Sequence, residues 1–567
     1  MQFFYRCNVQ IKVLNKICKN FLRYILNLII IVADKRVMKT LVILYADSRS
    51  LHIFDHIFDG KSAFERCLCW ADSCKKLSDS EIVVLADKSI ESECYSVLNK
   101  CNQNAELLVQ EKWTIHNLFQ VFAECTEKTG AENVIFAWAD QPFLNLGITE
   151  KILSDHIEFS GEYTFAEGYP AGLCSEVINA GTCRILSQLS ESVKKEIGKQ
   201  ILTRTSVFDL IKSDINSFEV ETVISDVDYR LFRMNFNCGT KNNTEACKEL
   251  FSMGVEKKNI EEISSEASKN VKILKTLPSY YNISITDYCS RRSIYIPSEM
   301  EKENDSSYMP LEQFKELVKK ISLFSESAVV SLSAWGEACA HPNFVEFVKA
   351  VLSEPGLSVL IETDGLHLTE DMCREIKEKL NSVPELIDGG EGREKIYWIV
   401  KLDAASKEKY VEINNGGEGF EKANSAVTLL AKYFSGSVYP QFVRMNENED
   451  ELEKFYRYWS DKNSPSCGKV IIQKYSSCCK LMAERKPADL SPLERNPCWH
   501  IRRDLTILFD GTVCFCREML RKNSVGNVFS DSLEDLWNKL TDEVQNHMKN
   551  KYSEMCGKCD EFYTFSF

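Results

Sequence analysis

Short apolar runs alternate with amphipathic stretches in the first half of the chain. The runs have the length and the aliphatic or aromatic composition of buried strands. These predicted strands are residues 41–46, 81–86, 106–110 and 133–138. Strands that alternate with helices form a parallel sheet with helices on its faces. We therefore predict an α/β domain over residues 38–251, with any ligand beyond the carboxyl ends of its strands.

A second alternating region follows, and it has six predicted strands. They are residues 281–286, 327–333, 357–362, 396–402, 437–443 and 470–475. The clearest helix between them begins near Pro310, a residue well suited to a first helical turn. Six β/α units predict a partial (β/α)6 TIM-type barrel over residues 277–487, whose functional residues follow the strand ends. Residues 252–276 are charged and without clear periodicity, so we expect a linker there.

The first 37 residues pose a separate question. Residues 21–33 are a short apolar run behind basic residues, similar to the core of a signal peptide but interrupted by Arg23 and Asn27. The run is too short to span a bilayer comfortably, so we expect no stable membrane span. The alternative, which we favour, is that translation starts at Met38 and residues 1–37 are an extension upstream of the true start.

Composition excludes several classes of function. The chain has 567 residues, of which 44% are hydrophobic and 27% charged, values typical of globular proteins with several domains. A net charge of -14 argues against general binding to nucleic acid or to anionic membranes. The 23 cysteines suggest a reducing, cytoplasmic location in which some thiols bind metal. The substrate, a peptide or a small molecule, cannot be read from the sequence.

The cysteines of residues 488–567 have the most specific spacing. Asp510-Gly511 predicts a hairpin turn between a strand at 505–509 and a second strand that ends at Cys516. A Cys-x2-Cys pair follows near the end of the chain, and the hairpin can supply further thiolates to the same metal. The candidate ligands are Cys498, Cys516, Cys556 and Cys559, with Cys514 as a candidate substitute. Spacing alone permits a four-thiolate zinc site or an iron-sulfur cluster.

This segment resembles the SPASM domain, the auxiliary-cluster extension of radical S-adenosylmethionine (SAM) enzymes. The shared pattern is a cysteine, then Asp-Gly-x-Val-x-x-Cys at 510–516, Gly526-Asn527, a helix bearing Trp537, and Cys-x2-Cys at 556–559. The resemblance implies one auxiliary [4Fe-4S] cluster held by Cys498, Cys516, Cys556 and Cys559.

The loop after the first predicted barrel strand resembles the radical SAM cluster motif, Cys-x3-Cys-x2-Cys, in a degenerate form. Here the three positions hold Cys289, Ser293 and Ile296. A hydroxyl and an isoleucine cannot replace two soft thiolates. Cys339 is the one nearby thiol that we consider as a replacement, and it raises the count only to two. We therefore predict that the chain does not cleave SAM reductively.

Other strand ends also resemble radical SAM motifs. Gly336-Glu337 resembles the Gly-Glu pair that holds the amino group of SAM, and Asp403 ends the fourth strand as the family's Leu-Asp-Gly does. Arg444, after the fifth strand, is a candidate carboxylate or ribose contact. The resemblance makes SAM a possible cofactor at these residues. The alternative is that Glu337 caps a helix and Asp403 a turn.

The first domain resembles the Rossmann-like nucleotidyltransferases, such as the cytidylyltransferases, in which an Asp binds a divalent metal. Asp140 is the candidate metal ligand. Lys61 is the candidate phosphate ligand. Residues 47–50 contain no glycine, so the backbone cannot approach a triphosphate closely. We expect weak or absent nucleotide binding, with Lys61 and Asp140 as solvated loop residues.

The whole arrangement after Met38 resembles the spiro-SPASM proteins. Three functions remain open: a radical SAM enzyme, a cluster-bearing binding or electron-relay protein, and a nucleotide-sugar-type nucleotidyltransferase.

Overall fold

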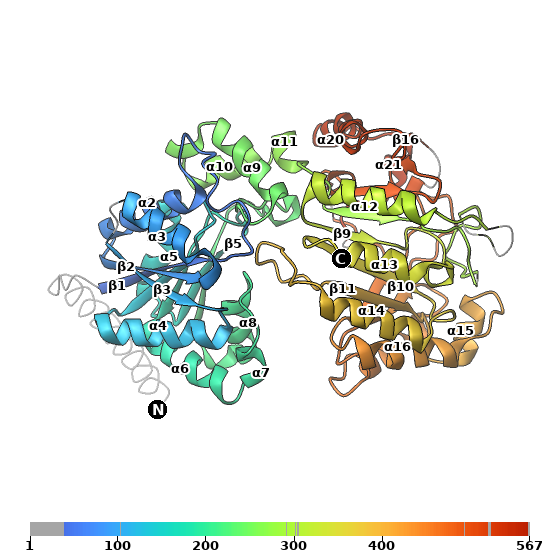
Figure 1. The fold of residues 1–567 in the computed structure, drawn as a ribbon, viewed down its shortest axis with the longest axis horizontal. Coiled ribbons are helices and arrows are strands. Elements are labelled where there is room, and N and C mark those ends of the chain that lie inside the picture. The colour runs from blue at the N-terminus through green and yellow to red at the C-terminus, as the bar shows by residue number, and fades with distance from the viewer. Residues whose placement is uncertain are drawn as a thin grey trace, which may run out of the picture.

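The computed structural model describes residues 39–101, 104–290, 292–300, 302, 306–492, 494–519 and 523–564. The expected extension, residues 1–37, lies outside the described residues. Figure 1 shows two lobes side by side, the first from the N-terminal half and the second from the barrel and the C-terminal segment. Within the described ranges, no helix is long and apolar enough to cross a membrane.

The first lobe is built on a seven-stranded sheet in the order β3-β2-β1-β4-β6-β5-β7. The four predicted strands are confirmed as β1 (Lys39–Ala46), β2 (Asp79–Asp87), β3 (Ala105–Gln110) and β4 (Asn133–Trp138), all parallel. The other three are β5 (Tyr163–Glu167), β6 (Glu176–Asn179) and β7 (Val220–Ile224), and β6 is antiparallel to both neighbours.

Helices bury alternate residues of β1 on opposite faces of this sheet. Val42 and Leu44 pack under α2 (Ala63–Ser73), α3 (Glu91–Lys100), α5 (Leu146–Glu158) and α9 (Lys241–Ser252). Leu41 and Ile43 pack under α4 (Ile115–Thr129), α6 (Ala180–Glu191) and α8 (Ser206–Lys212). This arrangement is the predicted α/β domain.

The expected linker at 252–276 is instead largely helical. It contains α10 (Ile260–Ala267) and α11 (Val271–Leu274). Ile260, Ile263 and Ile273 are buried in the core of the first lobe, and Asn259 caps α10 through a capping box. The helical spacing of these few apolar residues is hard to see in the sequence because charged side chains occupy most positions between them.

The second lobe is built on a nine-stranded sheet in the order β13-β12-β11-β10-β9-β8-β14-β15-β16. Its six predicted strands are β8 (Tyr280–Ile283), β9 (Ala328–Ser331), β10 (Leu357–Thr363), β11 (Ile396–Lys401), β12 (Val438–Arg444) and β13 (Ile471–Lys474), all parallel. The covering helices are α12 (Leu311–Ser325), α13 (Phe344–Leu352), α14 (Glu370–Ser382), α15 (Lys407–Ile413), α16 (Phe420–Tyr433) and α17 (Leu452–Trp459). The predicted partial barrel is confirmed.

The C-terminal segment continues this sheet. β14 (Asp504–Ile507) pairs parallel to β8, and β15 (Thr512–Cys514) and β16 (Ser524–Asn527) follow antiparallel. The short helices α18 (Trp499–Arg503), α19 (Leu533–Asn538), α20 (Thr541–Met548) and α21 (Glu554–Lys558) complete the segment. The hairpin therefore places the C-terminal cysteines beside the first barrel strand.

Candidate functional site

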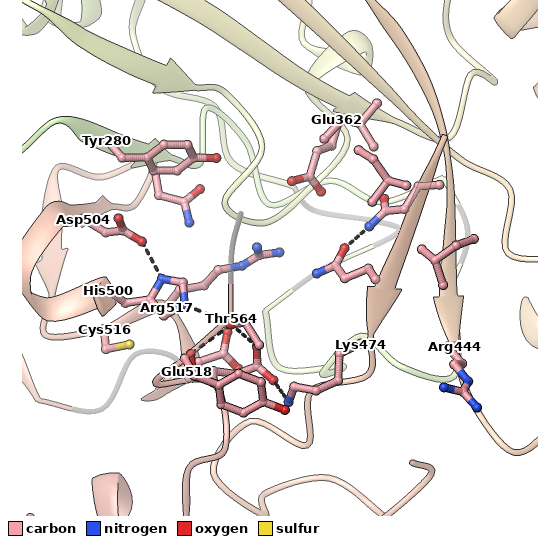
Figure 2. A pocket seen from close by; sticks show the side chains of 18 of the residues that line it. Tyr280, Glu362, Arg444, Lys474, His500, Asp504, Cys516, Arg517, Glu518 and Thr564 are labelled. Carbon is pink, nitrogen blue, oxygen red and sulfur yellow. Dashed lines mark hydrogen bonds and ion pairs between the residues drawn. The ribbon is translucent and has the colours of Figure 1, made fainter. Parts of the chain in front are cut away.

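The inner face of the barrel sheet borders a cavity of about 750 Å³. Barrel strands supply Tyr280, Glu362 and Gln441 to its wall, and the C-terminal segment supplies His500, Cys516 and Arg517 (Figure 2). Large, partly polar cavities of this kind are the usual place for a small ligand. This cavity is the candidate functional site.

Most charged groups around the cavity are paired. His500 Nδ1 lies 2.7 Å from a carboxylate oxygen of Asp504, and Lys474 Nζ lies 3.0 Å from Asp560 and also contacts Glu561. Arg517 and Glu362 form no close ion pair within the described part of the chain, but, against the lowering effect of burial, the nearby Glu362 and Glu518 carboxylates raise the pKa of Arg517. The Nε atom of Arg517 is buried without a hydrogen-bond partner there.

The Arg517 side chain reaches into the cavity from the turn after β15. Its guanidinium lies 4.9 Å from the centre of the Trp335 ring, a cation–π contact that helps fix its position. An arginine presents five N–H donors in a planar fork, which suits a carboxylate or phosphate group. The cavity therefore offers one guanidinium that a bound anion could pair.

The four predicted ligand cysteines gather next to this cavity. Cys498 is the N-cap of α18, Cys516 follows β15, and Cys556 and Cys559 lie in and just after α21. Cys556 packs with Cys516 and Cys559. Burial and the neighbouring Cys559 thiol raise the pKa of Cys498 to about 12. Burial likewise raises the pKa of Cys516 and Cys556, so binding of a metal or cluster must release the protons of these three thiols.

The spacing of these sulfurs bears on the choice between zinc and a cluster. Sulfurs around a tetrahedral zinc with bonds of about 2.3 Å lie about 4 Å apart. Among the described residues, no three cysteine sulfurs lie within 4.8 Å of one another. The arrangement is wider than a single zinc ion requires.

Two residues beside Cys556 were not predicted from the sequence. Glu543 and His547 of α20 each place a possible ligand atom within 4.8 Å of the other and of Cys556 Sγ. Burial lowers the pKa of His547 to about 4, so its ring is neutral at pH 7. Their i, i+4 spacing was the available signal, but α20 itself was not predicted.

Cys514 is not with the four cysteines. It packs in a different apolar cluster with Trp335 and Leu508. The predicted second strand ends at Cys514 and not at Cys516, so Cys516 lies in the following turn and faces another way. Cys514 thus lies apart from the cluster of Cys516, Cys556 and Cys559.

The loop after β8 contains the three positions of the degenerate cluster motif. Cys289 is buried, and it lines a space of only about 10 Å³ together with Gly336 and Glu337. The Ser293 hydroxyl donates a 2.6 Å hydrogen bond to Asn414 Oδ1. Ile296 packs against the apolar cluster around Trp335. Each of the two replaced positions thus has a structural role.

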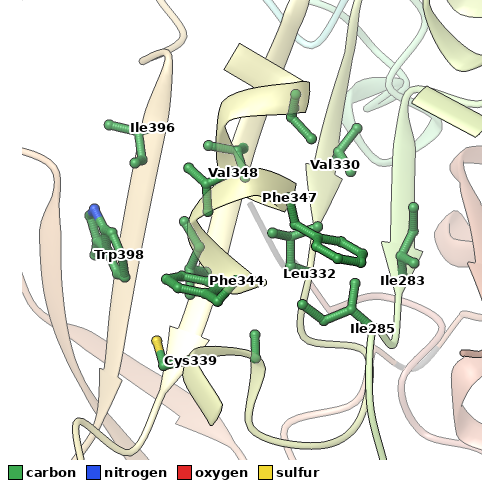
Figure 3. Packing of buried hydrophobic residues seen from close by; sticks show 14 of the residues in the cluster. Ile283, Ile285, Val330, Leu332, Cys339, Phe344, Phe347, Val348, Ile396 and Trp398 are labelled. Atoms are coloured by element: carbon green, nitrogen blue, oxygen red, sulfur yellow. The ribbon is translucent and has the colours of Figure 1, made fainter. Parts of the chain in front are cut away.

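Cys339, the thiol considered as a replacement ligand, belongs to the apolar core. It is 1% exposed and packs beneath α13 in the main apolar core, near Phe344 and Trp398 (Figure 3). Burial is the largest cause that raises the pKa of its thiol, which keeps it protonated.

Glu337 is held by several donors at the edge of β9. Its carboxylate accepts hydrogen bonds from Thr363 Oγ1 at 2.6 Å, the Asp364 amide at 2.9 Å and the Cys339 amide at 3.3 Å. Burial raises its pKa to about 7, and the nearby Asp364 contributes in the same direction. The amide contact from Cys339 makes Glu337 the N-cap of the short helix 338–340, as the capping alternative predicts.

The remaining predicted cofactor residues are tied to other groups. Asp403 accepts hydrogen bonds from the Val443 amide at 2.8 Å and from the Tyr295 hydroxyl at 2.7 Å. Arg444 Nε donates to Glu449 at 2.7 Å and lines the large cavity. The structure thus brings Gly336 and Glu337 to Cys289 but leaves Arg444 on the wall of the large cavity.

At the strand ends of the first lobe, Asp140 is buried and paired, not solvated as expected. Arg204 Nη2 lies 2.6 Å from its carboxylate, and the Ser50 hydroxyl donates to the same oxygen at 2.7 Å. Lys61 is exposed, as expected. The sequence contained no sign of Arg204, because it lies 64 residues from Asp140.

A loop from the second lobe fills the space beside this pair. It comes from the segment between α14 and β11, which reaches the first lobe in Figure 1. Arg204 Nη2 donates a hydrogen bond of 2.6 Å to the Gly389 carbonyl. The Arg204 amide donates one of 3.1 Å to the Gly390 carbonyl. A Cβ on Gly389 would lie 2.7 Å from the Gly239 backbone, so only glycine permits this approach. The carboxyl edge of β1 and β4 is thus covered by the chain itself.

Family models match both parts of the second lobe. Residues 287–458 match the radical SAM superfamily, and residues 498–560 match SPASM, an iron-sulfur cluster-binding domain. The chain belongs to the radical SAM/SPASM family. The model for SPASM begins at Cys498 and includes Cys516, Cys556 and Cys559.

Three proteins illustrate what this family member is similar to. An uncharacterized protein of Treponema pallidum is 37% identical over 369 residues, which are 64% of this chain and 98% of the relative. A cytidylyltransferase from Leptospira borgpetersenii is 14% identical, with 42% of this chain and 97% of that chain covered at a TM-score of 0.35. BtrN, solved with AdoMet and 2-DOIA, is 17% identical, with 50% and 94% covered at a TM-score of 0.33.

The family implies a cluster at the radical SAM position and another at the SPASM position, and the residues of this chain fit only one of them. At the radical SAM position they do not fit, because Cys289 is the one thiol among residues 289, 293 and 296. At the SPASM position they fit, because Cys516, Cys556 and Cys559 pack together and Cys498 lies near Cys556 and Cys559. The two positions of this protein therefore differ in their donor chemistry.

Proposed function

We propose that this protein is a cluster-bearing binding or electron-relay protein of the radical SAM/SPASM family that does not cleave SAM. The observation that carries the proposal is the hydrogen bond from Ser293 to Asn414, which commits the second ligand position to a polar structural contact. Ile296, at the third position, is committed to apolar packing. A chelating iron site for SAM has one thiolate there instead of three.

In this proposal Cys498, Cys516, Cys556 and Cys559 hold one [4Fe-4S] cluster. Such a cluster supplies one-electron transfer when bound. The protein's own contribution is a buried thiol environment beside the cavity, which Cys516 lines directly. The large number of free thiols supports a reducing, cytoplasmic setting.

The ligand that we propose is a small molecule with an anionic group. The guanidinium of Arg517 would bind that group, and the nearby carboxylate of Glu362 would face a donor or cationic group of the same molecule. Both residues line the cavity, so a ligand that contacts both groups gains affinity from each. The net charge of -14 and the enclosed cavity favour a small molecule over a nucleic acid.

Two measurements on anaerobically purified protein test the proposal. Iron and acid-labile sulfide content should give about four iron atoms per chain, and zinc in place of iron would refute the cluster. Incubation with dithionite and SAM should give no 5′-deoxyadenosine above a Cys289→Ala control. Formation of 5′-deoxyadenosine that depends on Cys289 would restore the enzyme interpretation.

A further inference from the structure

The segment after β13 has an unusual backbone. Cys478, Cys479 and Lys480 have φ angles of +49°, +57° and +64°, the left-handed region that non-glycine residues rarely adopt. The Ser476 hydroxyl accepts from the Cys478 amide at 3.1 Å, and the Ser477 hydroxyl accepts from the Lys480 amide at 3.2 Å. Such residues persist where the surrounding structure fixes them. The segment therefore holds its two cysteines in defined directions.

The two adjacent cysteines face different surroundings. Cys478 packs with Trp335 and Cys514 on the barrel side. Cys479 is 3% exposed and packs with Met519 and Cys556, in the same cluster as Cys516 and Cys559. Cys559 packs against the same cluster. Cys479 thus joins the four predicted ligands as a fifth thiol.

A [4Fe-4S] cluster takes four thiolates, so one of these five thiols is surplus. Cys479 lies outside the region that matches the SPASM model, residues 498–560. We infer that Cys479 is an alternative cluster ligand that can replace Cys559, its direct neighbour. This inference rests on the proposed function, because it assumes that the four SPASM cysteines hold a cluster.

The replacement balances chemically without an added reactant. With a cluster bound, the iron–sulfur bond to Cys559 would break and a bond to Cys479 would form at the same iron. The proton of the Cys479 thiol would move to the departing Cys559 thiolate, and no atom would change oxidation state. Thiol exchange of this kind requires the two sulfurs to lie near each other, and Cys479 and Cys559 belong to one packed cluster.

The test uses alanine variants of the full chain, because a serine oxygen could remain a ligand. Cys559→Ala should retain most of the wild-type iron and sulfide after anaerobic reconstitution, since Cys479 takes its place. The double variant Cys479→Ala/Cys559→Ala should lose the cluster, with iron reduced about tenfold, because three thiols remain. Cys498→Ala is the matched control that should lose the cluster alone, since Cys498 packs in a different apolar cluster from Cys479. Cys478→Ala should change nothing.

The outcomes separate the two claims. If wild-type protein binds iron but Cys559→Ala loses as much as Cys498→Ala, the inference is wrong and the proposed function stands. If wild-type protein binds no iron, both are wrong. If Cys559→Ala does not fold by circular dichroism, Cys559→Ser carries the test through the EPR g values of the reduced cluster. An all-thiolate spectrum like the wild type, lost on adding Cys479→Ala, supports the inference, whereas a spectrum unaffected by Cys479→Ala overturns it.

Discussion

The two lobes have similar strand ends, but these are covered in the first lobe and lie beside a cavity in the second. Each has parallel strands whose carboxyl ends carry polar residues, Asp140 in the first lobe and Glu337 in the second. In the first lobe a loop of the same chain covers Asp140, and its charge is neutralised by Arg204. In the second lobe the inner face of the sheet retains a cavity of about 750 Å³ that the Arg517 guanidinium lines.

The difference shows that a strand-end carboxylate is not by itself a sign of ligand binding. Asp140 and Glu337 are both buried, but Asp140 pairs with a cation within its own lobe and supports contact between lobes. The loop that covers it satisfies the Arg204 donors that a phosphate could otherwise occupy. We therefore interpret the first lobe as a structural partner of the barrel.

The largest expected effect concerns Asp140. Asp140→Ala leaves the buried Arg204 guanidinium without its main partner, which should lower the free energy of unfolding by about 4 kcal/mol. Urea unfolding measures this loss. Lys61→Ala is the control and should cost less than about 0.5 kcal/mol because Lys61 is exposed. Tight magnesium-dependent binding of CTP to the wild type, lost in Asp140→Ala, would instead restore a nucleotide site at this edge.

A second prediction compares one buried glutamate from each lobe. Glu176 has one carboxylate oxygen without a hydrogen-bond partner among the described residues, and burial raises its pKa to about 7. The folded state retains a proton that the unfolded state releases above the ordinary pKa of 4.5, so stability falls as pH rises from 4.5 to 7. Glu176→Gln should therefore stabilise the protein at pH 8 by up to about 3 kcal/mol and have little effect at pH 4.

The matched variant Glu337→Gln should behave oppositely. Its carboxylate accepts three hydrogen bonds, two at Oε1 and one at Oε2. The amide nitrogen of glutamine cannot accept the hydrogen bonds of the oxygen that it replaces. Thermal unfolding at pH 4 and pH 8 measures both variants. A stabilising effect of Glu337→Gln at pH 8 would show that the two glutamates are equivalent and that the strand end of the barrel has no special constraint.

The smallest effect tests the contact between the lobes. Gly389→Ala should destabilise the protein by about 2 kcal/mol more than Gly416→Ala. Both glycines have positive φ, but only Gly389 meets another backbone, at 2.7 Å, whereas Gly416 has nothing within 4 Å. Equal unfolding midpoints for the two variants would show that the loop does not press against the first lobe.

The sequence predicts the two sheets well because their strands are nearly continuous apolar runs. The sequence does not predict features that depend on a residue far away in the chain. The charged side chains of 252–276 conceal the buried face of α10, and nothing near Asp140 identifies Arg204.

The candidate site divides in the same way. The spacing of Cys498, Cys516, Cys556 and Cys559 indicates a common site, because it resembles the cysteine pattern of the SPASM domain. Cys479, Arg517 and Glu362 carry no such pattern. Only the folded barrel brings them to the thiols and the cavity.

The covering loop also has a consequence for how the chain folds during synthesis. Arg204 and Gly389 are separated by 185 residues, so the first lobe leaves the ribosome well before the loop that completes its edge. At a synthesis rate of about 5 to 20 residues per second, that loop is made about 10 to 40 seconds after Arg204. In this interval Arg204 lacks its hydrogen bonds to Gly389 and Gly390, and the barrel later supplies them as an intramolecular cap.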